Sequence, residues 1–180
     1  MSRGTKSRSE PVVEVRRTVN PEGVESEVSD RTMSTYTQIL YHIVFSTKNR
    51  ETTLSADRRP ELYKYIWGVI QNKDSHLYRI NGVEDHIHIL SSLHPSLALS
   101  DFVKDIKVSS SSWIKNHQVF SHFTHWQDGY GAFTLSIKEK DALIEYIKDQ
   151  EEHHRQVVFQ EELKKLLEDA GIDFDERYLV

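Results

Sequence analysis

The sequence predicts an α+β fold: the ferredoxin-like split βαβ arrangement, with an antiparallel sheet, helices on one face and a C-terminal helical extension. Two observations carry this prediction. The patterned segments follow the order strand, helix, strand, strand, helix, strand, and only Glu84 and Asp85 separate the two middle strands. More helical sequence then follows the last strand. A chain of 180 residues suffices for one domain with tails and is too short for a (β/α)₈ barrel.

Residues 1–33 are expected to form a disordered arm, because they contain Pro11 and Pro21 and no sustained apolar period. Residues 34–180 are expected to form one domain, with a catalytic core over about 34–150 and a C-terminal helical tail over 151–180.

The elements of the core follow from apolar periodicity. Alternation from Gln38 to Ser46 predicts a strand with one buried face, and spacings of three and four predict a helix over 59–73. The runs 77–83 and 86–93 read as a hairpin around Glu84 and Asp85.

The second half continues this pattern. Ser100 and Asp101 are expected to cap a helix that runs to Ile114. Residues 126–136 read as a loop that feeds a strand, and 138–150 as a helix. A last amphipathic stretch ends at Gly171, a candidate C-cap.

Composition narrows the function. Hydrophobic residues make up 37% and charged residues 28% of the chain, and no run of 18 apolar residues exists, so we expect no membrane span. The first 30 residues lack the apolar core of a secretory signal, so we expect a cytoplasmic protein, near the nucleoid of a bacterium. With no cysteine, any metal must be held by histidine or oxygen ligands, and ten histidines are present.

The net charge of −5 does not exclude nucleic acid as a partner. Residues 34–150 carry thirteen basic and thirteen acidic side chains, whereas 151–180 carry four basic and nine acidic ones. The predicted core is therefore neutral, and a basic groove on one face remains compatible with the sequence.

His86 and His88 flank Ile87 within a predicted strand, so they project from one face and could form half of a metal site. Two partly exposed strand histidines are an equally good reading of this pattern. Tyr146 and Gln150 lie four apart on a predicted helix and could approach one site, although simple packing of Tyr146 is the better reading of that pair alone.

The two pairs are more informative together. A divalent ion held by the histidines and the Gln150 oxygen would polarise a phosphate within reach of the Tyr146 hydroxyl. A tyrosine that attacks a phosphodiester forms a covalent phosphotyrosine and conserves the bond energy for rejoining, with no nucleotide cofactor.

Five motifs in order then carry a family resemblance over residues 35–180: YHIVFSTK (41–48), HIH (86–88), WQDGYGAF (126–133), YIKDQEEHH (146–154) and DERYL (175–179). The chain resembles the HUH single-tyrosine transposases of the insertion sequence 200/605 group, including relatives associated with repetitive extragenic palindromes. The arm before Met33 is its departure from that family.

The resemblance implies that Tyr146 is the nucleophile and that His86, His88 and Gln150 bind Mg²⁺ or Mn²⁺. It further implies single-stranded DNA with a hairpin as substrate, a homodimer, and a mobile element as genetic context. Whether the site forms within one subunit or across two is left open.

Further side chains are candidates for DNA contact. They are Lys104, Lys107, Lys115, Trp126, Tyr130 and His154. The three lysines could neutralise phosphates, and the two aromatic residues could stack on bases. The histidine lies near the helix face that carries Tyr146. Solvated helix faces and aromatic packing are the competing readings. Two other functions remain open: a hairpin-DNA-binding regulatory module without strand transfer, and a metal hydrolase in which water attacks.

Overall fold

The computed structural model describes residues 16–19, 25–28, 36–154 and 158–175, and the chain divides into two units, Met1–Tyr36 and Thr37–Val180. In the first unit, β1 (Arg16–Val19) pairs antiparallel with β2 (Glu25–Val28). The sequence pattern did not predict these strands. Disorder over 1–33 falls mostly on residues outside the described ones and stays a prediction, and most of the DERYL motif also lies outside them.

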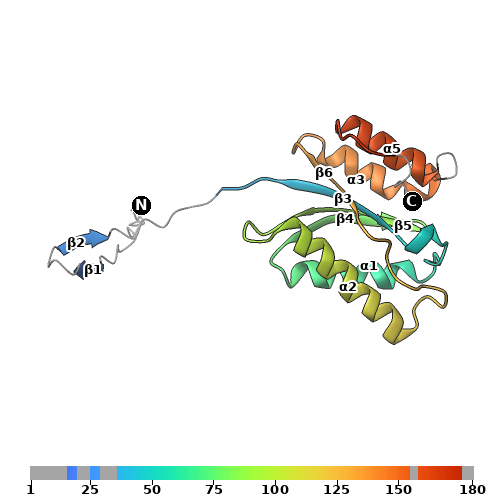
Figure 1. Cartoon of the computed structure of the whole chain (residues 1–180), viewed down its shortest axis with the longest axis horizontal. Coiled ribbons are helices and arrows are strands. Elements are labelled where there is room, and N and C mark those ends of the chain that lie inside the picture. Colours follow the sequence, from blue (N-terminus) through green and yellow to red (C-terminus); the bar gives the residue numbers. More distant parts are fainter. Residues whose placement is uncertain (1–15, 20–24, 29–35, 155–157, 176–180) are drawn as a thin grey trace, which may run out of the picture. The chain divides into compact units, whose positions relative to one another are not determined.

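The second unit contains the predicted four-stranded antiparallel sheet (Figure 1). Its strands are β3 (Leu40–Ser46), β4 (His76–Gly82), β5 (His86–Ser92) and β6 (Gly131–Leu135), in the spatial order β4-β5-β3-β6. Helix α1 (Arg59–Gln71) joins β3 to β4, and α2 (Leu99–His117) joins β5 to β6. This connectivity confirms the α+β class and the split βαβ arrangement.

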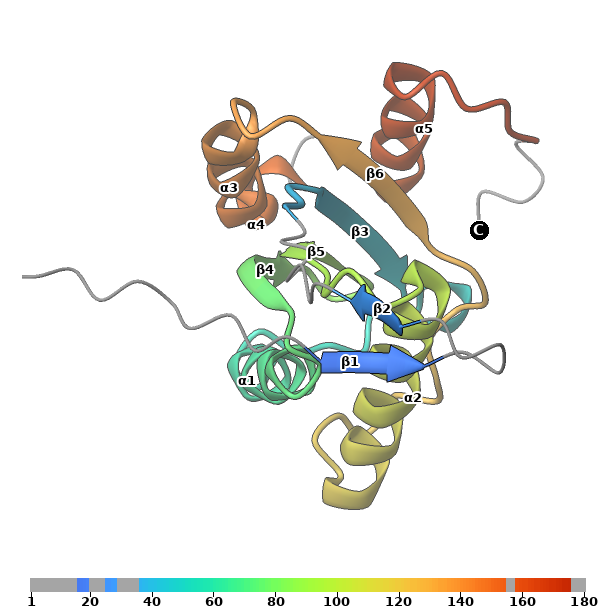
Figure 2. The same cartoon turned by 90° about the vertical axis from the view of Figure 1, so that its left-hand side faces the viewer.

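Helices α1 and α2 cover one face of the sheet (Figures 1 and 2). The main core lies there, because Ile43 and Phe45 of β3 and Ile87 and Ile89 of β5 all point toward these helices. Strand side chains alternate between faces, so the intervening residues of the same strands must project from the other face.

The opposite face is also covered, which the prediction of one buried face for β3 did not include. Leu40 of β3 and Leu90 of β5 pack against Ile147 of α3 (Lys140–Lys148), and β3 is buried on both sides. Two short helices follow, α4 (Gln150–His153) and α5 (Phe159–Asp169), and α5 lies on the α3 side (Figure 1). The tail therefore folds back over the sheet.

Element ends differ from prediction in two places. The helix expected over 138–150 is interrupted at Asp149, whose φ of −89° and ψ of 16° separate α3 from α4. Helix α2 begins at Leu99 after Ala98, so Ser100 lies inside the first turn and does not cap it. Gly171, with φ of 66°, follows α5 as predicted. No helix among the described residues is long and apolar enough to cross a membrane.

Ile89→Ala is expected to lower the free energy of unfolding by about 2–5 kcal/mol, because it removes a fully buried side chain from the central strand β5 and leaves a cavity. The control Val108→Ala, on a side chain 58% exposed, should change it by less than about 0.5 kcal/mol. Urea denaturation followed by circular dichroism measures both. Equal effects of the two substitutions would contradict the core described above.

Candidate functional site

His86 and His88 lie on the sheet face that α3 covers. The register pairs His88 with Val44 and His86 with Ser46, away from the face that packs on α1 and α2. Both side chains are fully buried, and their ring centroids lie 5.0 Å apart. The prediction that they share one face is confirmed, and the reading of partly exposed strand histidines is excluded by their burial.

Each of the two imidazoles is held through Nδ1. His86 Nδ1 lies 2.6 Å from Oδ1 of Asp85, and His88 Nδ1 lies 2.9 Å from Nε2 of the buried His42. The Nε2 atoms of His86 and His88 are buried without a hydrogen-bond partner among the described residues. Burial lowers the pKa of His86 to about 4, so this ring is neutral at pH 7. Imidazole rings that are anchored at one nitrogen and have no hydrogen-bond partner at the other are suited to metal ligation.

Tyr146 and Gln150 approach the same spot from the helical side. Gln150 is fully buried at the start of α4, and its Oε1 has no hydrogen-bond partner among the described residues. Tyr146 extends from α3, with its ring 6.1 Å from that of His88. Asn81 of β4 donates from Nδ2 to the carbonyl of Lys148 at 2.9 Å and thereby fastens the end of α3 to the sheet.

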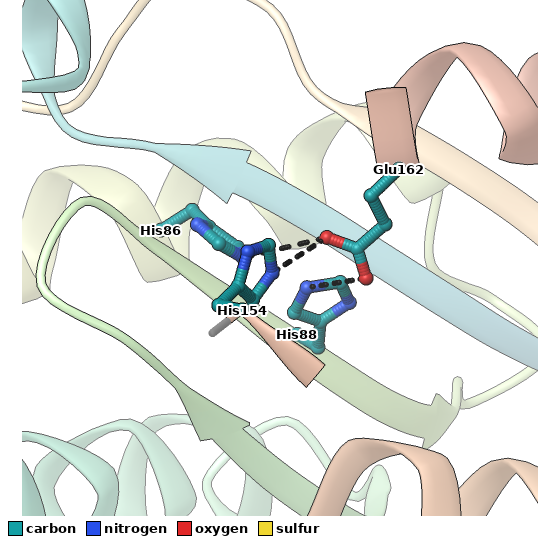
Figure 3. A group of neighbouring side chains, drawn as sticks. All are labelled: His86, His88, His154 and Glu162. Atoms are coloured by element: carbon teal, nitrogen blue, oxygen red, sulfur yellow. Dashed lines mark hydrogen bonds and ion pairs between the residues drawn. The ribbon is translucent and has the colours of Figure 1, made fainter. Parts of the chain in front are cut away.

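A further carboxylate, that of Glu162 on α5, points toward His86, His88 and His154 (Figure 3). The side chain is only 3% exposed. Tyr146 donates its hydroxyl hydrogen to Oε1, and Gln150 Nε2 donates to the same oxygen at 3.2 Å. On the other side, His154 Nε2 lies 2.9 Å from Oε2. Glu162 was absent from the candidates that the sequence suggested.

Electrostatics in the site favour an ionised Glu162 and a neutral Tyr146. Burial opposes the charge on Glu162, but the hydrogen bond from His154 and the neighbouring His88 hold the pKa of this carboxyl well below its usual range. Burial and the Glu162 charge raise the pKa of Tyr146. The phenol therefore carries its proton at neutral pH in this arrangement.

The donor set is chemically suited to a divalent cation. His86, His88, His154 and Glu162 each offer one ligand atom, and these atoms lie within 4.8 Å of one another. Gln150 adjoins this group through the contact of its Nε2 with Glu162, and its Oε1 has no hydrogen-bond partner among the described residues. Imidazole nitrogens combined with carboxylate and amide oxygens suit Mn²⁺ and related ions, and the oxygens suit Mg²⁺.

The lysines expected to contact DNA lie elsewhere. Lys104 and Lys115 are exposed on α2, which covers the sheet face opposite the histidines. Lys107 is half-buried, and its Nζ donates to the carbonyls of Gln127 and Gly129, each at 2.6 Å. We infer that Lys107 primarily holds this loop in place.

The two candidate aromatic residues differ in access. Trp126 is 4% exposed, packs in the core against Phe45 and donates from Nε1 to Ser110 Oγ at 2.9 Å. Because its ring is buried, Trp126 is not available to stack on a base as expected. The alternative reading, aromatic packing, is the one that the structure supports. Tyr130 is 41% exposed and could meet a base. His154 lies in the site itself through its contact with Glu162.

The ferredoxin-like sheet, the two histidines on a central strand and the tyrosine helix across that face agree with the resemblance to HUH transposases. Residues 35–150 match the family described as "Transposase IS200 like", and the chain belongs to this family. Membership implies DNA cleavage and strand transfer. Glu162 and His154 lie beyond the matched residues.

Individual relatives agree with this assignment. The ISDra2 transposase TnpA of Deinococcus radiodurans is 24% identical over 118 residues, which span 63% of this chain and 84% of that protein. The transposase for insertion sequence element IS200 of Salmonella typhimurium is 26% identical over 120 residues, or 64% of this chain and 78% of that protein.

Two solved structures share the fold. A Deinococcus radiodurans R1 protein described as a transposase superposes with a TM-score of 0.52 at 22% identity and covers 67% of this chain and 97% of its own. A REP-associated tyrosine transposase bound to a REP hairpin has a TM-score of 0.52 at 17% identity, covering 69% and 76% respectively. At these identities the likeness supports the fold.

Proposed function

We propose that this protein cleaves and rejoins single-stranded DNA through a covalent 5′-phosphotyrosine intermediate, with Tyr146 as the nucleophile and a divalent ion as the cofactor. The observation that carries the proposal is that side chains from β5, α3 and α4 approach one another on one face of the sheet. The Tyr146 hydroxyl, Gln150 Nε2 and the Nε2 atoms of the two strand histidines all lie close to the buried carboxylate of Glu162.

The residues fit a bound ion, because one ligand-type atom of each is buried without a hydrogen-bond partner among the described residues. These atoms are His86 Nε2, His88 Nε2 and Gln150 Oε1. We assign them as the ligands of Mg²⁺ or Mn²⁺. When bound, a divalent ion polarises the scissile phosphate and stabilises the charge that develops in the transition state.

The chain's own groups supply nucleophile and orientation. The Tyr146 oxygen forms a bond to phosphorus, and the bond from phosphorus to the 3′ oxygen of the departing strand breaks, which leaves a free 3′ hydroxyl. The Tyr146 hydroxyl loses one proton and the departing 3′ oxygen gains one, so the step is balanced without net release of a proton. Asp85 and His42 hold the two strand histidines in orientation. A free 3′ hydroxyl can reverse the step, so no nucleotide cofactor is needed.

Hairpin-containing single-stranded DNA is the proposed substrate. Membership of the transposase family supports DNA as the substrate, and the solved structure of the REP-associated tyrosine transposase contains a bound REP hairpin. The exposed Tyr130, Lys104 and Lys115 remain the proposed additional DNA contacts. We also propose that the protein is a homodimer and that it is cytoplasmic and associated with the nucleoid. In the proposed domain organisation, residues 34–150 form the catalytic core, residues 151–180 the C-terminal tail and residues 1–33 the N-terminal arm. The Tyr146 and the histidine pair brought together here belong to one chain.

The experiment is incubation with labelled hairpin oligonucleotides and Mn²⁺, followed by denaturing electrophoresis. We expect a protein–DNA band that disappears with chelator, and mass spectrometry should locate the nucleotide on the peptide that contains Tyr146. Hairpin binding without such a band, with flanking sequences of the protein's own genomic locus included, would favour the regulatory binding module.

A further inference from the structure

Glu162 is a buried carboxylate that the chemistry of the two histidines, Gln150 and Tyr146 does not by itself require. It comes from α5, beyond the residues that match the family. Its two oxygens nevertheless face the two strand histidines: Oε1 lies 3.5 Å from His88 Nε2, and Oε2 lies 3.6 Å from His86 Nε2. Both distances are beyond a hydrogen bond of normal length.

The contact with His86 joins two acceptors. Because His86 Nδ1 lies 2.6 Å from the Asp85 carboxylate, the proton of the neutral ring belongs on Nδ1, and Nε2 presents a lone pair. That lone pair faces Oε2 of the Glu162 carboxyl group inside a buried site. Two buried acceptors that face each other repel unless a proton or a metal cation lies between them.

The spacing suits such a cation. Two ligand atoms, each about 2.1 Å from one ion, lie roughly 3.0 Å apart at a right angle and roughly 3.4 Å apart at a tetrahedral angle. The separations of 3.5 and 3.6 Å between the Glu162 oxygens and the imidazole nitrogens are close to the upper value. Small adjustments of these side chains would therefore bring all three residues onto one ion.

The carboxylate is also held in orientation. His154 contacts Oε2, whereas Tyr146 and Gln150 donate to Oε1. Metal-binding carboxylates are commonly fixed by such outer hydrogen bonds, which raise affinity by limiting reorganisation. These contacts also place the Tyr146 hydroxyl next to the proposed ion.

We propose that Glu162 is itself a ligand of the divalent ion, so that the C-terminal helix α5 completes the metal site begun by the histidines of β5. The proposal rests on the metal site of the proposed function and deepens it. If so, the bound ion connects helix α5 to strand β5, and loss of the ion removes one of the contacts that hold α5 on the sheet.

Calorimetric titration of the full chain with Mn²⁺ in the absence of DNA tests the ligand. Glu162→Gln is expected to weaken Mn²⁺ binding at least tenfold, because an amide oxygen replaces a charged one. Glu161→Gln removes the same charge from an exposed position of the same helical turn and should leave the affinity unchanged. Equal or tighter binding by Glu162→Gln would overturn the assignment.

Two additions keep the outcomes distinct. His88→Ala should abolish Mn²⁺ binding. If His88→Ala bound Mn²⁺ with wild-type affinity, the metal site of the proposed function would be wrong. If His88→Ala lost binding while Glu162→Gln kept full affinity, only the proposal for Glu162 would be wrong. Hydrogen exchange of the wild-type chain needs no variant: saturation with Mn²⁺ should increase protection of the α5 amides, and unchanged protection would count against the proposal.

Discussion

Tyr146→Phe is expected to abolish the covalent protein–DNA band, with a loss of at least about a thousandfold in cleavage, while hairpin affinity stays within about twofold. The substitution removes only the hydroxyl oxygen that would bond to phosphorus and keeps the ring that packs beside His88. Denaturing electrophoresis with labelled hairpin oligonucleotides and Mn²⁺ measures the adduct, and fluorescence anisotropy measures binding.

Tyr36→Phe is the matched control, because it deletes the same hydroxyl from a tyrosine that is 91% exposed and outside the metal-ligand group. It should retain full adduct formation. A Tyr146→Phe variant that still forms the adduct would refute the assigned nucleophile. A variant that cleaves without any adduct and leaves free phosphate ends would point to attack by water and to the hydrolase alternative.

His88→Ala is expected to reduce Mn²⁺-dependent cleavage at least about a hundredfold, because it deletes a fully buried nitrogen of the proposed metal site. Binding of the hairpin should persist, since His88 is inaccessible to solvent. Single-turnover cleavage over a series of Mn²⁺ concentrations measures the effect, and thermal unfolding of the metal-free protein checks that the variant folds.

The control for this substitution is His122→Ala, which deletes an exposed imidazole in the segment between α2 and β6. It should cleave as the wild type does. If His88→Ala also cleaved at the wild-type rate and with unchanged Mn²⁺ dependence, the ion would have to be held elsewhere or be unnecessary.

Local patterns were sufficient to predict most of the fold. The alternation in β3 and the helical spacing in α1 each arise because one face of the element packs against the main core. The structure confirms both elements. What local patterns miss is a second layer. Burial of His42 and Leu40 follows from the return of α3 over the sheet, and nothing within the strand encodes that return.

The candidate site divides in the same way. Strand alternation and helical spacing suffice to group His86 with His88, and Tyr146 with Gln150. Glu162 comes from a separate helix, and its approach to the histidines depends on tertiary packing. A signal was nevertheless present: with Phe159, Leu163 and Leu166 it shares the spacing of an apolar helix face, where a carboxylate needs a partner.

The contact between His42 and His88 has a consequence for the ion. Across the 2.9 Å between His42 Nε2 and His88 Nδ1 there is room for a single proton. An ion on the far nitrogen of His88 requires that proton to belong to His88, and His42 must then keep its own hydrogen on Nδ1. Binding of the ion would thus fix the tautomer of His42, a residue that does not itself bind the ion.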